Sequence, residues 1–221
     1  METISNNILF VGPTFRGLGA AAIDTAQTFQ IRSPVKRGDV EALSGVEPGV
    51  LVLVDGLFHD ALAVGHIEIR NAVERGWQVW GVSSMGAIRA YEMRTLGVRG
   101  YGAVYERFYA EEDFQDDEVS LLHASAPDYT PISEPLIHLR AALDAYVSEG
   151  MLTGERGRNI ELALKSLWYG DRTLDLFFRL LREQIDPSRL PDLPQLRAGF
   201  DRHRLKTHDL DRFLVNHIWQ R

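Results

Sequence analysis

The chain has 221 residues, of which 45% are hydrophobic and 25% charged, and a formal net charge of −7. This composition is typical of one globular domain, with or without a small appendage, and it excludes disordered and fibrous proteins. Cysteine is absent, so we expect a cytoplasmic protein without disulfides or thiolate metal sites. Lys and Arg are scattered, so we expect no nucleic acid as partner. No apolar run reaches the roughly 18 residues of a membrane helix, so we expect no membrane as partner.

Four short apolar runs in the first half of the chain predict a parallel β-sheet. They cover residues 8–11, 29–31, 50–54 and 77–82. The last two are continuously apolar, which indicates strands buried on both faces. The segment 61–75 between them has a helical pattern that ends at Gly76. A strand–helix–strand unit of this length has a right-handed crossover, so we expect 50–54 and 77–82 to be adjacent strands.

Beyond residue 130 the apolar residues recur with a helical period. The four stripes are Leu136, Leu139, Leu143, Tyr146 and Val147; Ile160, Leu164, Leu167 and Trp168; Leu174, Phe177, Phe178 and Leu181; and Leu210, Phe213, Leu214 and Ile218. Ser133 and Thr173 are the expected N-caps of the first and third helices. The sequence therefore predicts an α/β fold: an open, mostly parallel sheet with flanking helices over residues 1–125, followed by a helical region over 126–221.

Ligands of open parallel sheets bind outside the carboxyl ends of the strands, and polar residues follow three of the expected strands. Gly12-Pro13-Thr14 follows the first, Asp55-Gly56 the third and Ser83-Ser84-Met85-Gly86 the fourth. A serine at a sharp strand-to-helix turn has the geometry of an activated nucleophile, and Gly86 allows a tight turn. The alternative is that Ser84 is only a helix N-cap.

Two histidines near the third strand end are candidate bases for this serine. His59 and His66 are seven residues apart, so both lie on nearly one face if a helix spans them. Either is a candidate for proton transfer, and the alternative is a histidine satisfied by interfacial contacts. Asp55 is a candidate strand-end carboxylate or the first residue of a turn. A metal site made by His59, His66 and Asp55 is a further alternative.

The segment 111–118 is strongly acidic. A charge run of this kind most often forms a solvated loop. The functional alternative is that Asp116, Asp117 and Glu118 bring carboxylates to the strand-end cleft or dock a basic partner.

Several short motifs, taken in order, resemble the TfuA-like family. The matching segments are Gly12-Pro13-Thr14, Val35-Lys36-Arg37-Gly38-Asp39, Asp55-Gly56-x-Phe58, Ala63-Val64-x-His66-x-Glu68-Ile69, Gly81-x-x-Ser84-Met85-Gly86-Ala87-x-Arg89-Ala90-x-Glu92, Gly97-Val98-x-Gly100-x-Gly102, Asp116-Asp117-Glu118-Val119 and Ser133-Glu134. The departures are Ile67, where the family usually has Lys, and Tyr91, where Ala is common. His59 stands where the family has no histidine, which favours His66 as the base.

The resemblance implies a role beside YcaO enzymes, which activate a peptide-backbone amide with ATP. The TfuA-like partner assists replacement of the amide oxygen by sulfur, and the product is a thioamide in a ribosomal peptide natural product or a modified protein. The implied sulfur source is sulfide or a ubiquitin-like carrier with a C-terminal thiocarboxylate. The expected partners are thus a YcaO-type enzyme and the sulfur carrier, with the precursor peptide reached indirectly, and no cofactor is expected.

Three functions remain open for the serine turn. In the first, an enzyme, Ser84 attacks the acyl carbon of the thiocarboxylate and His66 moves the proton. Glu68, Glu92 or Asp55 then orients the histidine, and the N–H groups of Met85 and Gly86 hold the oxyanion, with Arg89 as a further contact. In the second, the protein is an adaptor that recruits the carrier, and the turn only packs. In the third, the helix N-terminus after Gly86 binds a small anion.

Overall fold

A computed structural model of the chain describes residues 6–57, 61–111, 114–185 and 193–221. Two compact units are present. The sheet unit contains Met1–Phe114, Ala126–Asp128 and Lys206–Arg221, and the helical unit contains Gln115–Ser125 and Tyr129–Leu205. The domain boundary expected after residue 125 stays a prediction. In the structure, the last segment of the chain belongs to the sheet unit rather than to the helices that precede it.

The sheet unit is built on five parallel strands in the order β2-β1-β3-β4-β5. The strands are β1 (Ile8–Phe10), β2 (Gln30–Arg32), β3 (Val50–Leu53), β4 (Gln78–Val82) and β5 (Arg99–Tyr101). The predicted α/β class is therefore confirmed, and β3 and β4 are adjacent, as the sequence predicts. The strand β5 was not predicted, because Arg99-Gly100-Tyr101 is short and carries no apolar run.

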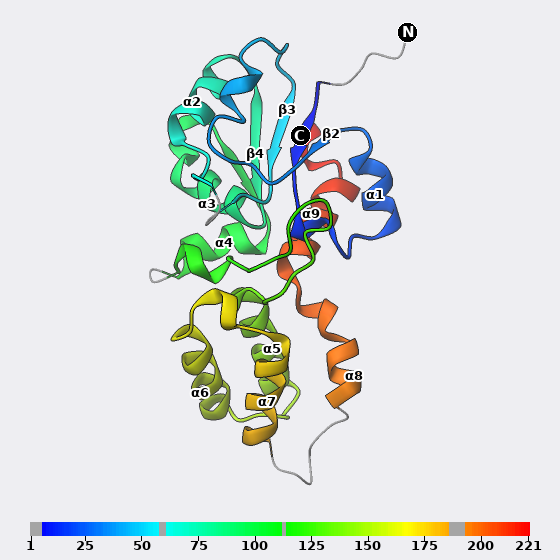
Figure 1. The fold of residues 1–221 in the computed structure, drawn as a ribbon, viewed down its shortest axis with the longest axis vertical. Coiled ribbons are helices and arrows are strands. Elements are labelled where there is room, and N and C mark those ends of the chain that lie inside the picture. Colours follow the sequence, from blue (N-terminus) through cyan, green and yellow to red (C-terminus); the bar gives the residue numbers. More distant parts are fainter. Residues whose placement is uncertain (1–5, 58–60, 112–113, 186–192) are drawn as a thin grey trace. The chain divides into compact units, whose positions relative to one another are not determined.

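Helices cover both faces of this sheet (Figure 1). Two of them, α2 (His66–Glu74) and α3 (Met85–Glu92), pack on one face over a core that includes Ile8, Leu51 and Ile69. On the other face lie α1 (Ala20–Ala26) and α9 (Leu205–Val215), over a core that includes Leu9 and Val52. A fifth helix, α4 (Ala103–Ala110), follows β5. Both faces of the central strands are thus buried, which explains their continuous apolar sequence.

The helix α2 begins five residues later than the sequence predicts, at His66 rather than at residue 61. The reason is the third helical residue, Glu68, whose carboxylate accepts a hydrogen bond from the Gly65 N–H (2.7 Å) and fixes the N-terminus there. His66 is consequently the first residue of the helix, not a residue two turns along it.

The helical unit contains α5 (Leu136–Ser148), α6 (Gly154–Lys165), α7 (Leu174–Gln184) and α8 (Leu193–Ala198) around one apolar core. Thr173 caps α7 as predicted, since its side chain accepts the N–H of Leu176. Ser133 does not cap α5, which begins after Pro135; its hydroxyl instead accepts the N–H of Leu122. In the part of the chain that the structure describes, no helix is long and apolar enough to cross a membrane.

Candidate functional site

Asp55, which follows β3, forms hydrogen bonds with the residues that follow the neighbouring strand β1. Its carboxylate accepts hydrogen bonds from the main-chain N–H of Gly12 (2.9 Å), the N–H of Thr14 (2.9 Å) and the hydroxyl of Thr14 (2.7 Å). The strand order reverses between β1 and β3, and open α/β sheets bind ligands at such a point. Asp55 is therefore a buried strand-end carboxylate whose oxygens accept the N–H groups of the loop that follows β1.

Lys206 joins Asp55 to the serine turn. Its ammonium lies 3.9 Å from the Asp55 carboxylate, and its main-chain carbonyl accepts a hydrogen bond from the Ser83 hydroxyl (2.6 Å). The Lys206 residue is only 2% exposed. The sequence did not single out Lys206, because it enters the site from α9, 123 residues after Ser83, and no local pattern reports so distant a contact.

The turn between β4 and α3 is as sharp as the sequence predicts. Ser83 has a φ of +68°, and the N–H of Ser84 donates to the carbonyl of Val82 (2.9 Å). A Cβ on Gly86 would lie 1.8 Å from the carbonyl oxygen of Leu53. Glycine is thus required at position 86, because the helix start presses against the backbone of β3.

Ser84 occupies the N-cap position of α3, but its hydroxyl does not cap the helix. Among the residues that the structure describes, no group forms a hydrogen bond with that hydroxyl, although the residue is only 3% exposed. A serine hydroxyl that no protein group engages, at a sharp strand-to-helix turn, is a candidate nucleophile. The reading of Ser84 as a side-chain cap receives no support from this geometry.

The two expected oxyanion donors differ in availability. The N–H of Gly86 is already bonded to the carbonyl of Val54 (3.1 Å). The N–H of Met85 donates to no acceptor within the described residues. It follows Ser84 directly and points from the first turn of α3, where the helix dipole favours negative charge. Met85 is therefore the better donor of the two.

His66 lies with Glu92 and Arg89 rather than with Ser84. Its Nε2 is 2.9 Å from the Glu92 carboxylate, which also accepts a hydrogen bond from Arg89 Nη1 (2.6 Å). Arg89 further donates through Nε to the carbonyl of Val64 (3.0 Å). Glu92 follows Ser84 by eight residues, about 12 Å along the helix. In the described residues no hydrogen bond or ion pair joins His66 to Ser84.

Glu68 serves the backbone rather than a histidine. Besides capping α2, its carboxylate accepts the N–H groups of Gly38 (3.0 Å), Val40 (3.2 Å) and Glu41 (3.3 Å). Glu68 follows His66 by two residues, about 200° around the helix, so the two side chains point in different directions. His59 lies outside the described residues.

The acidic residues 116–118 are engaged inside the helical unit. Asp117 binds Arg172 (2.6 Å), and the fully buried Glu118 lies 3.6 Å from both Arg140 and Lys165. These carboxylates connect the loop to the helical core, which is not the solvated loop that a charge run usually forms. Within the described ranges, no three His, Cys, Asp or Glu side chains form a group suited to a metal ion.

Comparison with protein families identifies a match. A family model described as TfuA-like protein covers residues 55–173, which is more than half of the chain. The matched range includes Asp55, His66 and Ser84 and ends before Lys206. None of the curated proteins matches the chain significantly.

Proposed function

From the premise that this chain belongs to the TfuA-like protein family, we propose that it acts beside a YcaO-type enzyme in peptide-backbone thioamidation. Its task there is to release sulfide from a ubiquitin-like sulfur carrier that bears a C-terminal thiocarboxylate. The YcaO-type enzyme binds and activates the peptide, so the precursor peptide meets this protein only indirectly.

The chemistry we propose is acyl transfer through Ser84. The Ser84 hydroxyl gives up its proton while its oxygen attacks the carbonyl carbon of the thiocarboxylate; the carbon–sulfur bond then breaks, and the sulfur takes a proton and leaves as HS⁻. Water then hydrolyses the Ser84 ester, which regenerates the hydroxyl and yields the carrier carboxylate. The observation that carries this proposal is the Ser84 hydroxyl, which has no described hydrogen-bond partner and lies next to the open N–H of Met85 at the start of α3.

The proton transfer is better assigned to the strand-end groups than to His66. His66 is bonded to Glu92, two turns along α3 from the serine. Asp55 lies at the strand ends with the Lys206 ammonium 3.9 Å from its carboxylate, and the main-chain carbonyl of Lys206 accepts the Ser83 hydroxyl, which brings this part of α9 to the serine turn. We therefore expect Lys206→Met to slow sulfide release by about 10²-fold or more, and His66→Ala to slow it much less. The reverse order of effects would restore His66 as the base.

Ser84→Ala tests the nucleophile. Removal of one oxygen hardly changes the side-chain volume, so the variant should fold and bind the carrier while sulfide release falls by about 10³-fold or more. Supplied free sulfide should restore thioamidation, because no acyl–sulfur bond then needs to break. Ser166→Ala, at the end of α6, is the matched control and should release sulfide at the wild-type rate. A Ser84→Ala variant with that same rate would refute the assignment.

An adaptor is the second candidate function, and the burial of Ser84 favours it, because a carrier tail must reach a residue only 3% exposed. In that case the protein recruits the carrier to the YcaO-type enzyme, and Ser84→Ala leaves the thioamide yield unchanged. Both candidates require that omission of the protein lowers the yield at limiting sulfur donor. An equal yield without it would contradict the partnership itself.

A further inference from the structure

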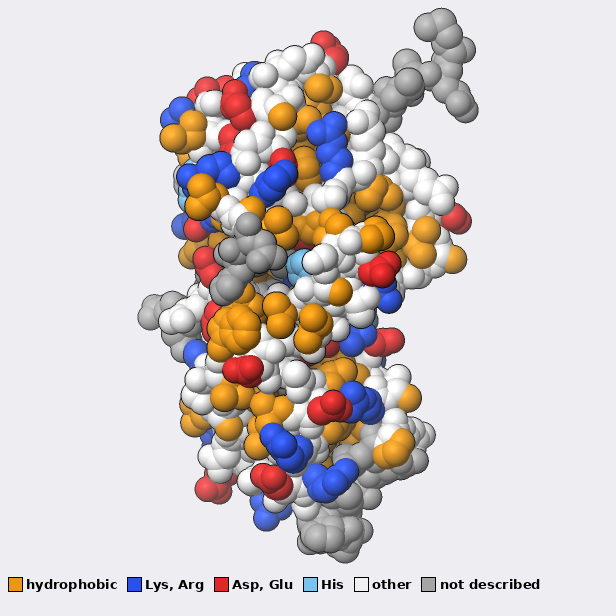
Figure 2. Space-filling view, in the orientation of Figure 1, with side chains coloured by type: hydrophobic (Ala, Val, Ile, Leu, Met, Phe, Trp, Pro, Cys, Tyr) orange, Lys and Arg blue, Asp and Glu red, His pale blue; other side chains and the backbone are white. Residues whose placement is uncertain are grey.

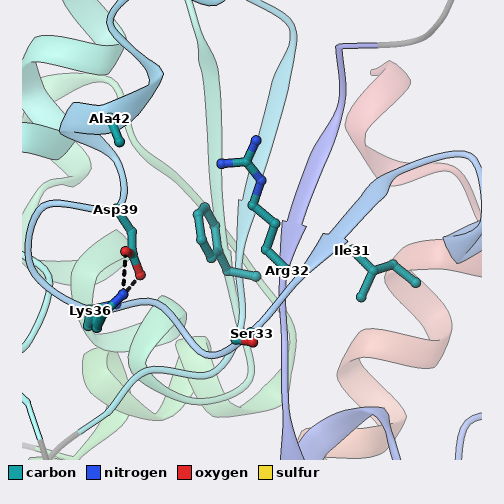
Figure 3. Close-up of a pocket in the computed structure, with 7 residues that line it drawn as sticks. Ile31, Arg32, Ser33, Lys36, Asp39 and Ala42 are labelled. Carbon is teal, nitrogen blue, oxygen red and sulfur yellow. Dashed lines mark hydrogen bonds and ion pairs between the residues drawn. The ribbon is translucent and has the colours of Figure 1, made fainter. Parts of the chain in front are cut away.

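A pocket of about 410 Å³ lies at the carboxyl ends of β1 and β2 (Figure 3). Its lining includes Phe10, the last residue of β1, and Arg32, the last residue of β2, which face each other in register. The pocket is also lined by Lys36, Asp39 and Ala42. The strand order separates this pocket from the serine turn after β4 by the whole of β3.

The pocket carries one uncompensated positive charge. The ammonium of Lys36 is bonded to the Asp39 carboxylate (2.7 Å), so these two charges cancel. Arg32 has no carboxylate partner among the described residues; its one side-chain hydrogen bond, to the amide oxygen of Gln30, is long at 3.5 Å. In a chain of net charge −7, this site is therefore locally basic. On the face shown in Figure 2, basic side chains of the sheet unit lie next to hydrophobic ones.

The guanidinium of Arg32 is positioned by an aromatic ring. Its central carbon lies 5.9 Å from the centroid of the Phe10 ring, a cation–π distance. The exposed Ala42 supplies apolar surface beside the charge, whereas the Phe10 ring is almost fully buried. A planar guanidinium held in this way presents two parallel N–H donors, which match the two oxygens of a carboxylate.

A phosphate suits this pocket less well than a carboxylate. In sheets with this strand order, phosphate groups are held by main-chain N–H groups of the β1 loop. Here the N–H groups of Gly12 and Thr14 are occupied by Asp55. A single unpaired cation is also matched to one negative charge rather than two.

We propose that the Arg32 pocket binds a carboxylate joined to a short apolar stem. The carboxylate pairs with the guanidinium through both oxygens, and the stem lies on Ala42. The ligand is a free small carboxylic acid or the C-terminal residue of a peptide, which share this chemistry. The site is independent of the proposed acyl transfer at Ser84.

Titration calorimetry on the full chain tests the ligand chemistry. N-acetyl-leucine has a carboxylate and an apolar stem, N-acetyl-leucine amide lacks the charge, and inorganic phosphate lacks the stem. We expect saturable binding of N-acetyl-leucine, with the amide and phosphate at least tenfold weaker. Equal affinity for the amide, or phosphate binding as tight as that of the acid, would overturn the proposal.

Three variants locate the site. Arg32→Ala should weaken binding of N-acetyl-leucine at least tenfold, and Arg32→Lys, which keeps the charge but loses the planar fork, should weaken it several-fold. Arg179→Ala removes the same charge from an exposed position on α7 and should bind like the wild type. The proposal fails if Arg32→Lys keeps the wild-type affinity, if a folded Arg32→Ala does so, or if Arg179→Ala is equally impaired.

A tetrapeptide that ends in leucine distinguishes the two sources of the carboxylate. Binding at least tenfold tighter than that of N-acetyl-leucine identifies the end of a peptide chain as the ligand. Equal binding identifies a free acid. Either result upholds the site, whereas no binding of either compound refutes it.

Discussion

Ser83 has a φ of +68°, a conformation that costs a serine energy and a glycine almost none. Its buried hydroxyl is bonded to the Lys206 carbonyl. Ser83→Ala and Ser83→Gly both remove that bond, but only the glycine variant relieves the backbone. We therefore expect Ser83→Gly to be more stable than Ser83→Ala by about 1 kcal/mol, measured by urea unfolding. If the alanine variant is equally stable, the turn stores no strain.

Gly86 is fixed by the close approach of α3 to β3. An alanine there would place its Cβ 1.8 Å from the Leu53 carbonyl, so the helix must move away from the sheet. We expect Gly86→Ala to lower the free energy of unfolding by about 3 kcal/mol or more. Gly45→Ala is the matched control, because nothing lies within 4 Å of its added Cβ, and it should change the stability by less than about 0.5 kcal/mol. Similar losses in both variants would contradict the close packing.

At the scale of elements, a side chain of α9 caps the N-terminus of α4. The carboxylate of Asp209 accepts the N–H groups of Ala103 and Val104, both at 2.9 Å. Burial raises the pKa of Asp209 from 3.8 to about 6, and the two N–H bonds offset only part of this effect. The folded protein therefore holds the Asp209 proton more tightly than the unfolded chain.

The sign of the resulting pH dependence follows from linkage. Protonation of Asp209 adds to the free energy of unfolding. This contribution is fully present below about pH 3.8 and is lost as the pH rises through about 6. The loss amounts to roughly 3 kcal/mol. Asp209→Asn cannot titrate, so the stability of the wild type should fall relative to this variant between pH 4 and pH 7, measured by urea unfolding at each pH. Parallel curves for the two proteins would show that Asp209 does not carry the effect.

The elements that were predicted correctly are those whose burial is visible in their own sequence as an apolar run. The runs at 50–54 and 77–82 are apolar except at the exposed Gln78, because helices cover both faces of the sheet. The start of α2 was predicted five residues early, since it depends on one carboxylate, that of Glu68, which also holds the backbone of residues 38–41. Periodicity alone does not report such a contact.

The candidate site likewise contains residues that the local sequence predicts and residues that depend on distant contacts. Asp55 and the serine turn follow strands, and the general rule for parallel sheets is enough to find them. Lys206 was missed as a site residue, and the role of Ser83 within the turn was not predicted, because a contact across 123 positions and a backbone angle leave no local pattern. The expected pairing of Ser84 with His66 depended on the position of His66 near the third strand end and on the family resemblance, and neither reports that the ring lies beside Glu92.

At the scale of the whole molecule, the sheet unit depends on the last segment of the chain. Five of its side chains are buried in the core over one face of the sheet: Leu210, Phe213, Leu214, Ile218 and Trp219. At about 2 kcal/mol for each buried side chain, their removal costs on the order of 10 kcal/mol. A domain of this size is usually stable by only about 5–15 kcal/mol. The sheet unit is therefore not expected to fold from residues 1–125 alone.

Two fragments test this dependence. Residues 1–125 should lack a cooperative thermal transition and give poorly dispersed amide resonances. Residues 1–128 joined by a flexible Gly/Ser linker to 206–221 should recover both, because the linked segment restores the apolar core, the Ser83–Lys206 bond and the Asp209 cap on α4. Cooperative unfolding of 1–125 alone, at a midpoint equal to that of the linked chain, would show instead that the sheet and its strand-end site form without α9.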